Sequence, residues 1–137
     1  MAIELDIQPL KRAILSLQAG MAEYARNPAN DVERDGCIQR FEFSYESSHK
    51  MLKRFVEATS ASPADVDAMS FPDLIRTGSE RNVLRSDWPR WKEFREARSI
   101  AGQAYDEPKA REVFAIIPDF LEEAENLCRR LEAEIAR

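Results

Sequence analysis

An apolar pattern near the end of the chain decides the fold. Residues 107–135 read EPKAREVFAIIPDFLEEAENLCRRLEAEI. Apolar side chains recur every three or four residues, at Ala110, Val113, Ile117, Phe120, Ala124, Leu127, Leu131 and Ile135. This spacing places them on one face of an α-helix. We therefore expect a long helix that starts after Asp106 and is kinked at Pro118, where proline removes one backbone hydrogen bond.

Two more long helices are expected earlier in the chain. Residues 3, 7, 10, 14, 17, 21 and 24 are all apolar or aromatic, a spacing that predicts a long amphipathic helix, with Asp6 as a candidate cap for its start. Turn-forming residues at 27–31 end it. A central helix should follow at residues 32–58, with an apolar face widened by Phe43 and Met51. Its other face is charged and is expected to be solvated, at Arg34, Asp35, Arg40, Glu42, Glu46, Lys50 and Lys53.

A short helical insertion is expected between the central helix and a fourth long one. A short helix should start at Pro63, capped by Ser62, and another after Ser70, and Gly78 should end the second in a left-handed conformation. Ser86 or Asp87 should cap the fourth long helix, which should fade near Ala104. With no strand pattern, the sequence predicts an all-α, antiparallel four-helix up-and-down bundle with a short insertion at residues 63–85. The 137 residues fit one domain, 1–137.

Charge and cysteine content narrow the function classes. The formal net charge is -5, but residues 76–98 alone carry +3 and the rest of the chain -8. This asymmetry favours an anionic partner near residues 76–98, while the acidic total argues against a general nucleic-acid coat. Cys37 and Cys128 lie far apart, so buried free thiols in a reducing compartment are expected. No signal peptide or membrane span is expected, and the predicted location is the cytoplasm.

The richest chemistry lies in residues 91–106, WKEFREARSIAGQAYD. At 100° per residue, one helix face collects Trp91, Arg95, Arg98, Gly102 and Tyr105. Two interpretations of the arginines remain open. They can pair with carboxylates at a helix seam or extend to water, or they can bind an anion such as an RNA phosphate.

Other catalytic signals are weak. His49 is the only histidine, has no cysteine or histidine at metal-ligand spacing, and is expected at the helix surface or boundary. No glycine-rich phosphate loop is present. We expect no metal and no cofactor, and the residues favour a binding or assembly protein over an enzyme.

Three separated motifs resemble a known family. They are RDGCIQRFEFSYE at residues 34–46, FPDLIR at residues 71–76, and the spaced residues Trp91, Arg98, Tyr105 and Asp106. With these three motifs in this order, the chain resembles the nucleotidyltransferase substrate-binding proteins, which belong to the HEPN class of helical bundles. The resemblance covers nearly the whole chain.

The resemblance implies a homodimer that pairs with a separately encoded minimal nucleotidyltransferase, often as a toxin and antitoxin. Many HEPN proteins are metal-independent ribonucleases that use an arginine followed after four to six residues by a histidine. Arg98 matches that arginine, Ser99 stands where asparagine is common, and Gln103 occupies the histidine position. Tyr105 matches a tyrosine to which the partner enzyme can add adenylate in ribonuclease members.

Glutamine exchanges no proton near neutral pH, so Gln103 cannot act as a general acid or base. The leading hypothesis is a non-catalytic subunit that contacts substrate, RNA or its partner through Arg95, Arg98, Gln103 and Tyr105. The alternative is a metal-independent ribonuclease toxin with an altered active site. A third hypothesis is a helical assembly protein whose arginines are structural. Tyr105 is either an adenylate acceptor or a packed ring with a bonded hydroxyl.

Overall fold

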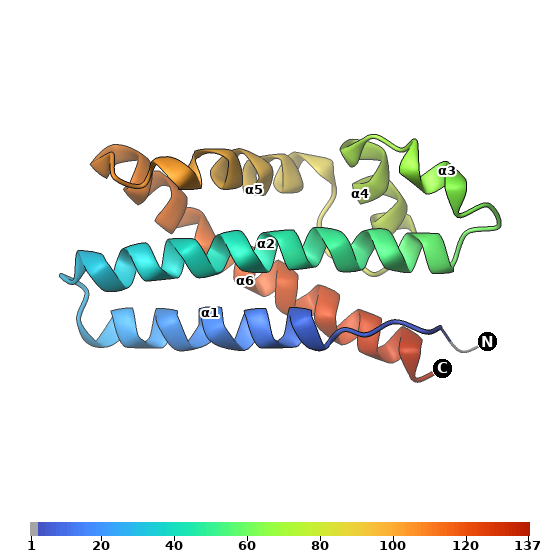
Figure 1. Ribbon diagram of the computed structural model, residues 1–137, viewed down its shortest axis with the longest axis horizontal. Coiled ribbons are helices and arrows are strands. Elements are labelled where there is room, and N and C mark those ends of the chain that lie inside the picture. Colours follow the sequence, from blue (N-terminus) through green and yellow to red (C-terminus); the bar gives the residue numbers. More distant parts are fainter. Residues whose placement is uncertain (1–2) are drawn as a thin grey trace.

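The computed structural model describes residues 3–137, which contain helices and no strand. The elements are α1 (Gln8–Arg26), α2 (Asp31–Ala58), α3 (Ala64–Asp67), α4 (Phe71–Glu80), α5 (Trp88–Ile100), the 3₁₀ turn η1 (Ala101–Gln103) and α6 (Glu107–Ile135). Helices α1, α2, α5 and α6 alternate in direction along the long axis, and α3 and α4 lie together at one end (Figure 1). The predicted all-α bundle with a short helical insertion is confirmed.

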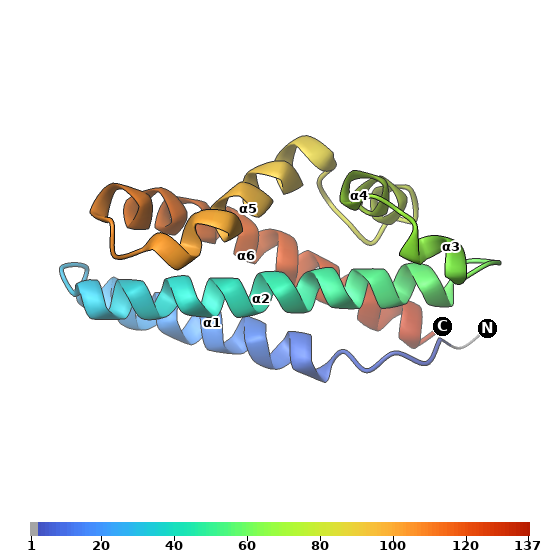
Figure 2. The same cartoon turned by 45° about the horizontal axis from the view of Figure 1, so that its top comes forward.

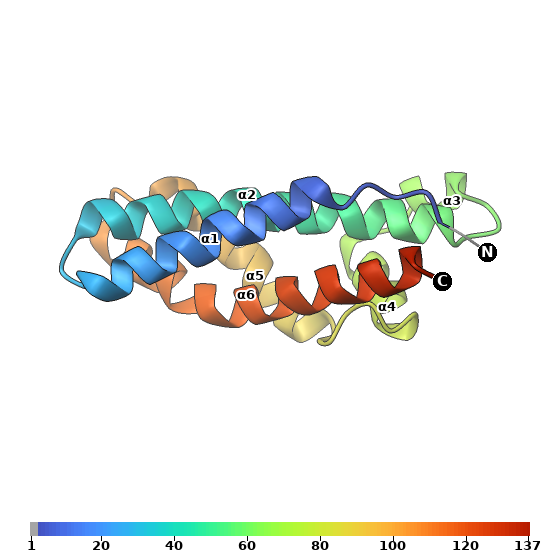
Figure 3. The same cartoon turned by 90° about the horizontal axis from the view of Figure 1, so that it is seen from below.

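Helix α2 is the centre of the bundle. It lies between α1 and the layer that contains α4 and α5, and α6 crosses beneath α5 to reach α1 (Figures 2 and 3). One hydrophobic core joins these helices. Phe120 of α6 meets Phe41 of α2 edge to face with ring centroids 5.1 Å apart, and Phe94 of α5 in the same way at 5.3 Å. These aromatic contacts set the packing of three helices. No helix in residues 3–137 combines the length and apolar character needed to cross a membrane.

The starts of α4 and α5 follow the predicted capping residues, whereas the N-cap of α3 is Pro63 and not the predicted Ser62. The Ser70 hydroxyl accepts a hydrogen bond from the Asp73 amide at 3.2 Å and caps α4, and the Asp87 carboxylate accepts from the Trp88 amide at 2.8 Å and caps α5. Helix α1 starts one residue later than a cap at Asp6 predicts. Ile7 is its N-cap residue, and Asp6 accepts a hydrogen bond from the Gln8 amide at 3.0 Å. The apolar spacing extends to residue 3 because the preceding non-helical segment also packs on the core.

Two further predictions were wrong. Gly78 lies inside α4, and the left-handed residue is Asn82, with φ 62°. A Cβ atom at Gly78 would lie 2.8 Å from Leu52 Cδ1, so this glycine permits close approach of α4 to α2. Phe43, predicted to widen the buried face of α2, is 70% exposed.

The prediction of buried free cysteines is confirmed, whereas the predicted kink in the last helix is not tested. Cys37 and Cys128 are free and buried, as predicted, and burial raises the pKa of both thiols. Helix α6 continues through Pro118, and the kink there stays a prediction.

Candidate functional site

The predicted stripe on α5 is divided between core and surface. Trp91 is 0% exposed, and its indole nitrogen donates a hydrogen bond to Glu123 at 3.3 Å. Arg95 is exposed and Arg98 half-buried, both at the surface of the bundle. The α-helix ends at Ile100, so the expected extension of one helical face to Tyr105 was wrong. Trp91 belongs to the core because its ring packs against Phe94 at 5.3 Å.

Arg98 is held by two carboxylates of α2. Its Nη1 lies 3.2 Å from Glu42 Oε2, and its Nη2 donates a hydrogen bond to Glu46. The hydrogen bond to Glu46, followed by the charges of Glu46 and Glu42, raises the pKa of Arg98 against the effect of its burial. The structural interpretation from the sequence, pairing at a helix seam, therefore holds for Arg98. Its Nε atom is buried and has no hydrogen-bond partner within the described chain.

Arg95 differs from Arg98 in that no carboxylate of residues 3–137 forms an ion pair with it. Its guanidinium carbon lies 5.3 Å from the centroid of the Phe71 ring, a cation–π contact between α5 and the first residue of α4. The side chain is exposed. Arg95 is therefore the arginine of this pair with a free charge.

Two residues of α2 that the sequence reasoning missed complete this surface. The Phe71 ring lies 4.6 Å from the imidazole of His49 and 6.4 Å from the ring of Tyr45, centroid to centroid. Burial raises the pKa of Tyr45 to about 12, although the charges of Arg95 and Arg98 act in the opposite direction. Burial lowers the pKa of His49, and Lys53 and Arg95 lower it further. His49 is half-buried, at the boundary between the core and the solvent, as predicted. The spacing of Tyr45 and His49, four residues on one helix, is the signal that would have grouped them.

The other two predicted site residues lie beyond α5. Gln103 ends the 3₁₀ turn, and its side-chain oxygen accepts a hydrogen bond from Lys109. Tyr105 is 89% exposed in the loop before α6. The expectation of a packed Tyr105 ring was therefore wrong. Within residues 3–137 no hydrogen bond or ion pair joins Arg98 to Gln103 or Tyr105: Arg98 bonds to carboxylates of α2, and Gln103 to Lys109.

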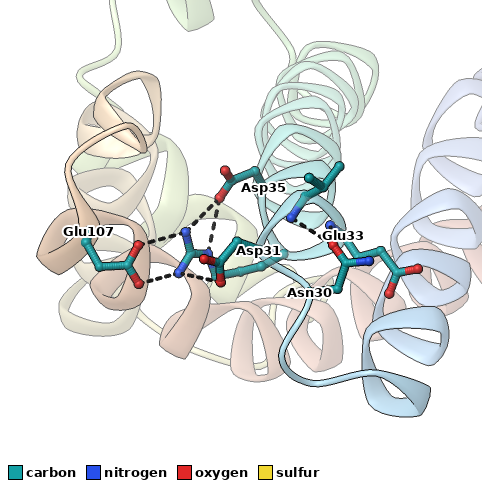
Figure 4. Close-up of polar contacts among 7 residues, drawn as sticks. Asn30, Asp31, Glu33, Asp35 and Glu107 are labelled. Carbon is teal, nitrogen blue, oxygen red and sulfur yellow. Dashed lines mark hydrogen bonds and ion pairs between the residues drawn. The ribbon is translucent and has the colours of Figure 1, made fainter.

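A buried arginine fastens the segment that carries Tyr105. Arg34 of α2 donates two hydrogen bonds to Glu107 at the start of α6, at 2.6 and 3.1 Å, and one to Asp35 at 3.1 Å (Figure 4). Asp31 lies 3.6 Å away. The hydrogen bond from Arg34 lowers the pKa of Glu107. Arg34 is 6% exposed, so the prediction of a solvated side chain was wrong, because three carboxylates surround it.

Comparison with known proteins places the chain in a family. The model for "Nucleotidyltransferase substrate binding protein like" proteins matches residues 5–133. The chain belongs to this family. It is 31% identical over 139 aligned residues to the protein named "Probable ribonuclease HepT" from Haemophilus influenzae, with 96% of this chain and 94% of that protein covered.

Solved structures agree with this family. HI0074 from Haemophilus influenzae, described as revealing the fold of a substrate binding domain of a nucleotidyltransferase, is 32% identical and superposes with a TM-score of 0.86. The alignment covers 93% of this chain and 99% of that one. A crystal structure of a Thermus thermophilus protein is 28% identical with a TM-score of 0.65, covering 89% and 98% of the two chains.

In this nucleotidyltransferase substrate-binding family member, a buried carboxylate sets the position of α5. Glu123 of α6 is 3% exposed and accepts hydrogen bonds from the Arg85 and Ser86 amides at 3.0 and 3.1 Å, from the Ser86 hydroxyl at 2.9 Å and from Trp91. These bonds hold the loop that leads into α5 against α6. Arg95 and Arg98 follow in the next turns of the same helix. Nothing in the sequence pattern indicated this role, because Glu123 lies among other acidic residues.

Proposed function

We propose that this chain is a non-catalytic substrate-binding subunit that pairs with a separately encoded minimal nucleotidyltransferase in a toxin-antitoxin-like module. The observation that carries the proposal is the side chain at position 103. A ribonuclease of the HEPN type needs a group there that exchanges a proton. Gln103 has none near neutral pH, and its oxygen already accepts a hydrogen bond from Lys109.

The contact face of the proposed subunit contains Arg95, Arg98, Gln103 and Tyr105. Tyr105 is the proposed adenylate acceptor, and its 89% exposure supports this role because a partner enzyme can reach the phenol. Co-expression with the cognate nucleotidyltransferase should add adenylate to the chain, measured as intact mass. The Tyr105→Phe variant should stay unmodified. An unchanged mass of the unaltered chain in a stable complex with ATP present would remove the acceptor role.

The proposed subunit is a homodimer. Phe43 is 70% exposed and lines shallow grooves between α1 and α2 together with Pro9, Ala13 and Ser47. Glu46, which binds Arg98, lines the same surface. An exposed phenylalanine beside an apolar groove is typical of an interface between protein subunits. Light scattering should give a dimer mass at tens of micromolar, and Phe43→Asp should give monomers.

A metal-independent ribonuclease is the second candidate function. It is supported by Arg98, which matches the arginine of that mechanism, and by the name of the Haemophilus influenzae relative, "Probable ribonuclease HepT". Incubating the purified chain with RNA separates the two proposals. The substrate-binding proposal expects no cleavage. Cleavage that is abolished in Arg98→Ala would favour the ribonuclease.

A pull-down from the native cells, read by mass spectrometry, tests the first proposal. It should recover a small nucleotidyltransferase with the tagged chain. Capture of the tagged chain without any nucleotidyltransferase would count against pairing.

A further inference from the structure

Several hydrogen-bond donors without acceptors meet where α2, α4 and α5 come together. They are the Tyr45 hydroxyl, the His49 imidazole, the Arg95 guanidinium and the Nε of Arg98. Within residues 3–137, Arg98 Nε is the donor of this group that is buried without a partner. The side chains of Tyr45, His49 and Arg95 form no hydrogen bond there either, but His49 is half-buried and Arg95 is exposed. Tyr45 is only 6% exposed. A buried donor left without an acceptor costs free energy, so the Nε of Arg98 indicates a missing partner.

The Phe71 ring brings these donors together. His49 contacts the ring at 4.6 Å, and Arg95 lies over it at 5.3 Å, so both groups border one aromatic side chain. The Tyr45 ring is 6.4 Å from the same ring. Its phenol is close enough to Arg95 and Arg98 for both charges to act on it. The Tyr45 ring, the imidazole and the guanidinium thus all lie around the Phe71 ring.

We propose that Tyr45, His49, Arg95 and the Nε of Arg98 form a binding site for a phosphate group carried by a nucleotide or by RNA. Each group donates a hydrogen bond, and a phosphate offers several oxygen acceptors to satisfy them together. Arg95 supplies the charge, as guanidinium groups commonly do for phosphates. The site gives a chemical class to the ligand of the substrate-binding subunit, and in that sense it rests on the proposed function.

The carboxylates beside the site determine which arginine contacts the phosphate first. Glu42 and Glu46 occupy the terminal nitrogens of Arg98, so a phosphate meets Arg95 first. The Glu46 side chain is 61% exposed and can move aside. The negative charge of Glu46 repels a phosphate that binds beside Arg95. Glu46→Gln should therefore bind phosphate ligands more tightly than the unaltered chain.

The single histidine makes the site directly observable. The C2 proton of His49 gives one imidazole signal in the NMR spectrum, because the chain has no other histidine. Lys53 of α2 and Arg95 of α5 act on His49 by charge, the apolar Phe71 of α4 lies against its ring, and Glu46 lies one helical turn before it on α2. The ligands to titrate are inorganic phosphate, AMP and a short single-stranded RNA. Binding should move the signal to saturation and raise the pKa of His49, because the phosphate charge stabilises the imidazolium.

Variants separate this site from general charge attraction. Arg95→Gln should weaken binding about tenfold, the typical effect of one charge-assisted hydrogen bond, and Tyr45→Phe should weaken it less. Arg129→Gln is the matched control, since it removes an exposed arginine of α6, and should bind as the unaltered chain does. Saturation by AMP or phosphate would identify a terminal phosphate as the ligand, and saturation by RNA alone a phosphodiester.

Two results would overturn the proposal. One is a His49 signal that none of the three ligands moves at millimolar concentration. The other is equal affinity for Arg95→Gln and the unaltered chain. The titration uses the chain without a nucleotidyltransferase, so its failure leaves the pairing proposal standing, and failed pairing leaves the phosphate site standing.

Discussion

Removal of the Glu123 carboxylate should destabilise the protein more than any surface change on α6. In Glu123→Ala, four donors lose their acceptor at once, namely the Arg85 and Ser86 amides, the Ser86 hydroxyl and the indole of Trp91. A buried donor without a partner costs about 1–3 kcal/mol. Water can reach the loop amides, since Arg85 is exposed and Ser86 half-buried, but not the indole of Trp91, which is 0% exposed. We expect a total loss of about 3–4 kcal/mol.

Urea unfolding followed by circular dichroism measures this loss. A total stability of about 5–15 kcal/mol leaves the variant folded, with a melting temperature lower by roughly 10–15 °C. Glu123→Gln keeps a carbonyl acceptor, and its amide can donate to the Ser86 hydroxyl, so it should lose only about 1–2 kcal/mol. Glu122→Ala, next to it on the exposed face, should change stability by less than about 0.5 kcal/mol. A Glu123→Ala variant as stable as Glu122→Ala would refute the role of Glu123 in holding α5.

Three further predictions concern packing, pH and catalysis. Gly78→Ala should destabilise the protein by about 1–3 kcal/mol, because the added Cβ overlaps Leu52. Gly36 has open space around it, so Gly36→Ala should stabilise α2 by about 0.5–1 kcal/mol. Chemical unfolding measures both changes. Glu107→Gln should be less stable than the unaltered chain at neutral pH, and the difference should vanish as the pH falls through the lowered pKa of Glu107, because the stability from that carboxylate exists only while it is charged. Gln103→His should gain some RNA cleavage if the rest of the ribonuclease site is present, and an RNA gel assay with equal, background cleavage in both proteins would show that more than one group is missing.

Helix positions were predictable from the sequence because they depend on local patterns. The apolar spacing of residues 107–135 and the capping residues Ser70 and Asp87 placed α6, α4 and α5 near their observed starts. Spacing alone does not say whether an apolar residue lies in a helix, so Ile3 and Ile7 extended α1 too far. The prediction for Gly78 failed for another reason. Glycine is favoured both at helix ends and where two helices pack closely, and only the position of Leu52 distinguishes these two roles.

The candidate site was predicted only in part, because its contacts join distant segments. Helical spacing singled out Arg95 and Arg98 but could not tell that Glu46 binds Arg98 and leaves Arg95 free. Tyr45 and His49 reach the site through Phe71, a residue of another helix. Helical spacing placed Tyr105 on the same face as Arg98. Because α5 ends at Ile100, Tyr105 lies instead in an exposed loop.

Pairing with a nucleotidyltransferase is the central claim, and one measurement tests it directly. The purified chain is mixed with its proposed nucleotidyltransferase partner, and the mixture is separated by size-exclusion chromatography with light scattering. A peak whose mass equals that of both proteins together, larger than the mass of this chain measured alone, is the predicted result. Two separate peaks with the masses of the individual proteins at tens of micromolar would contradict it.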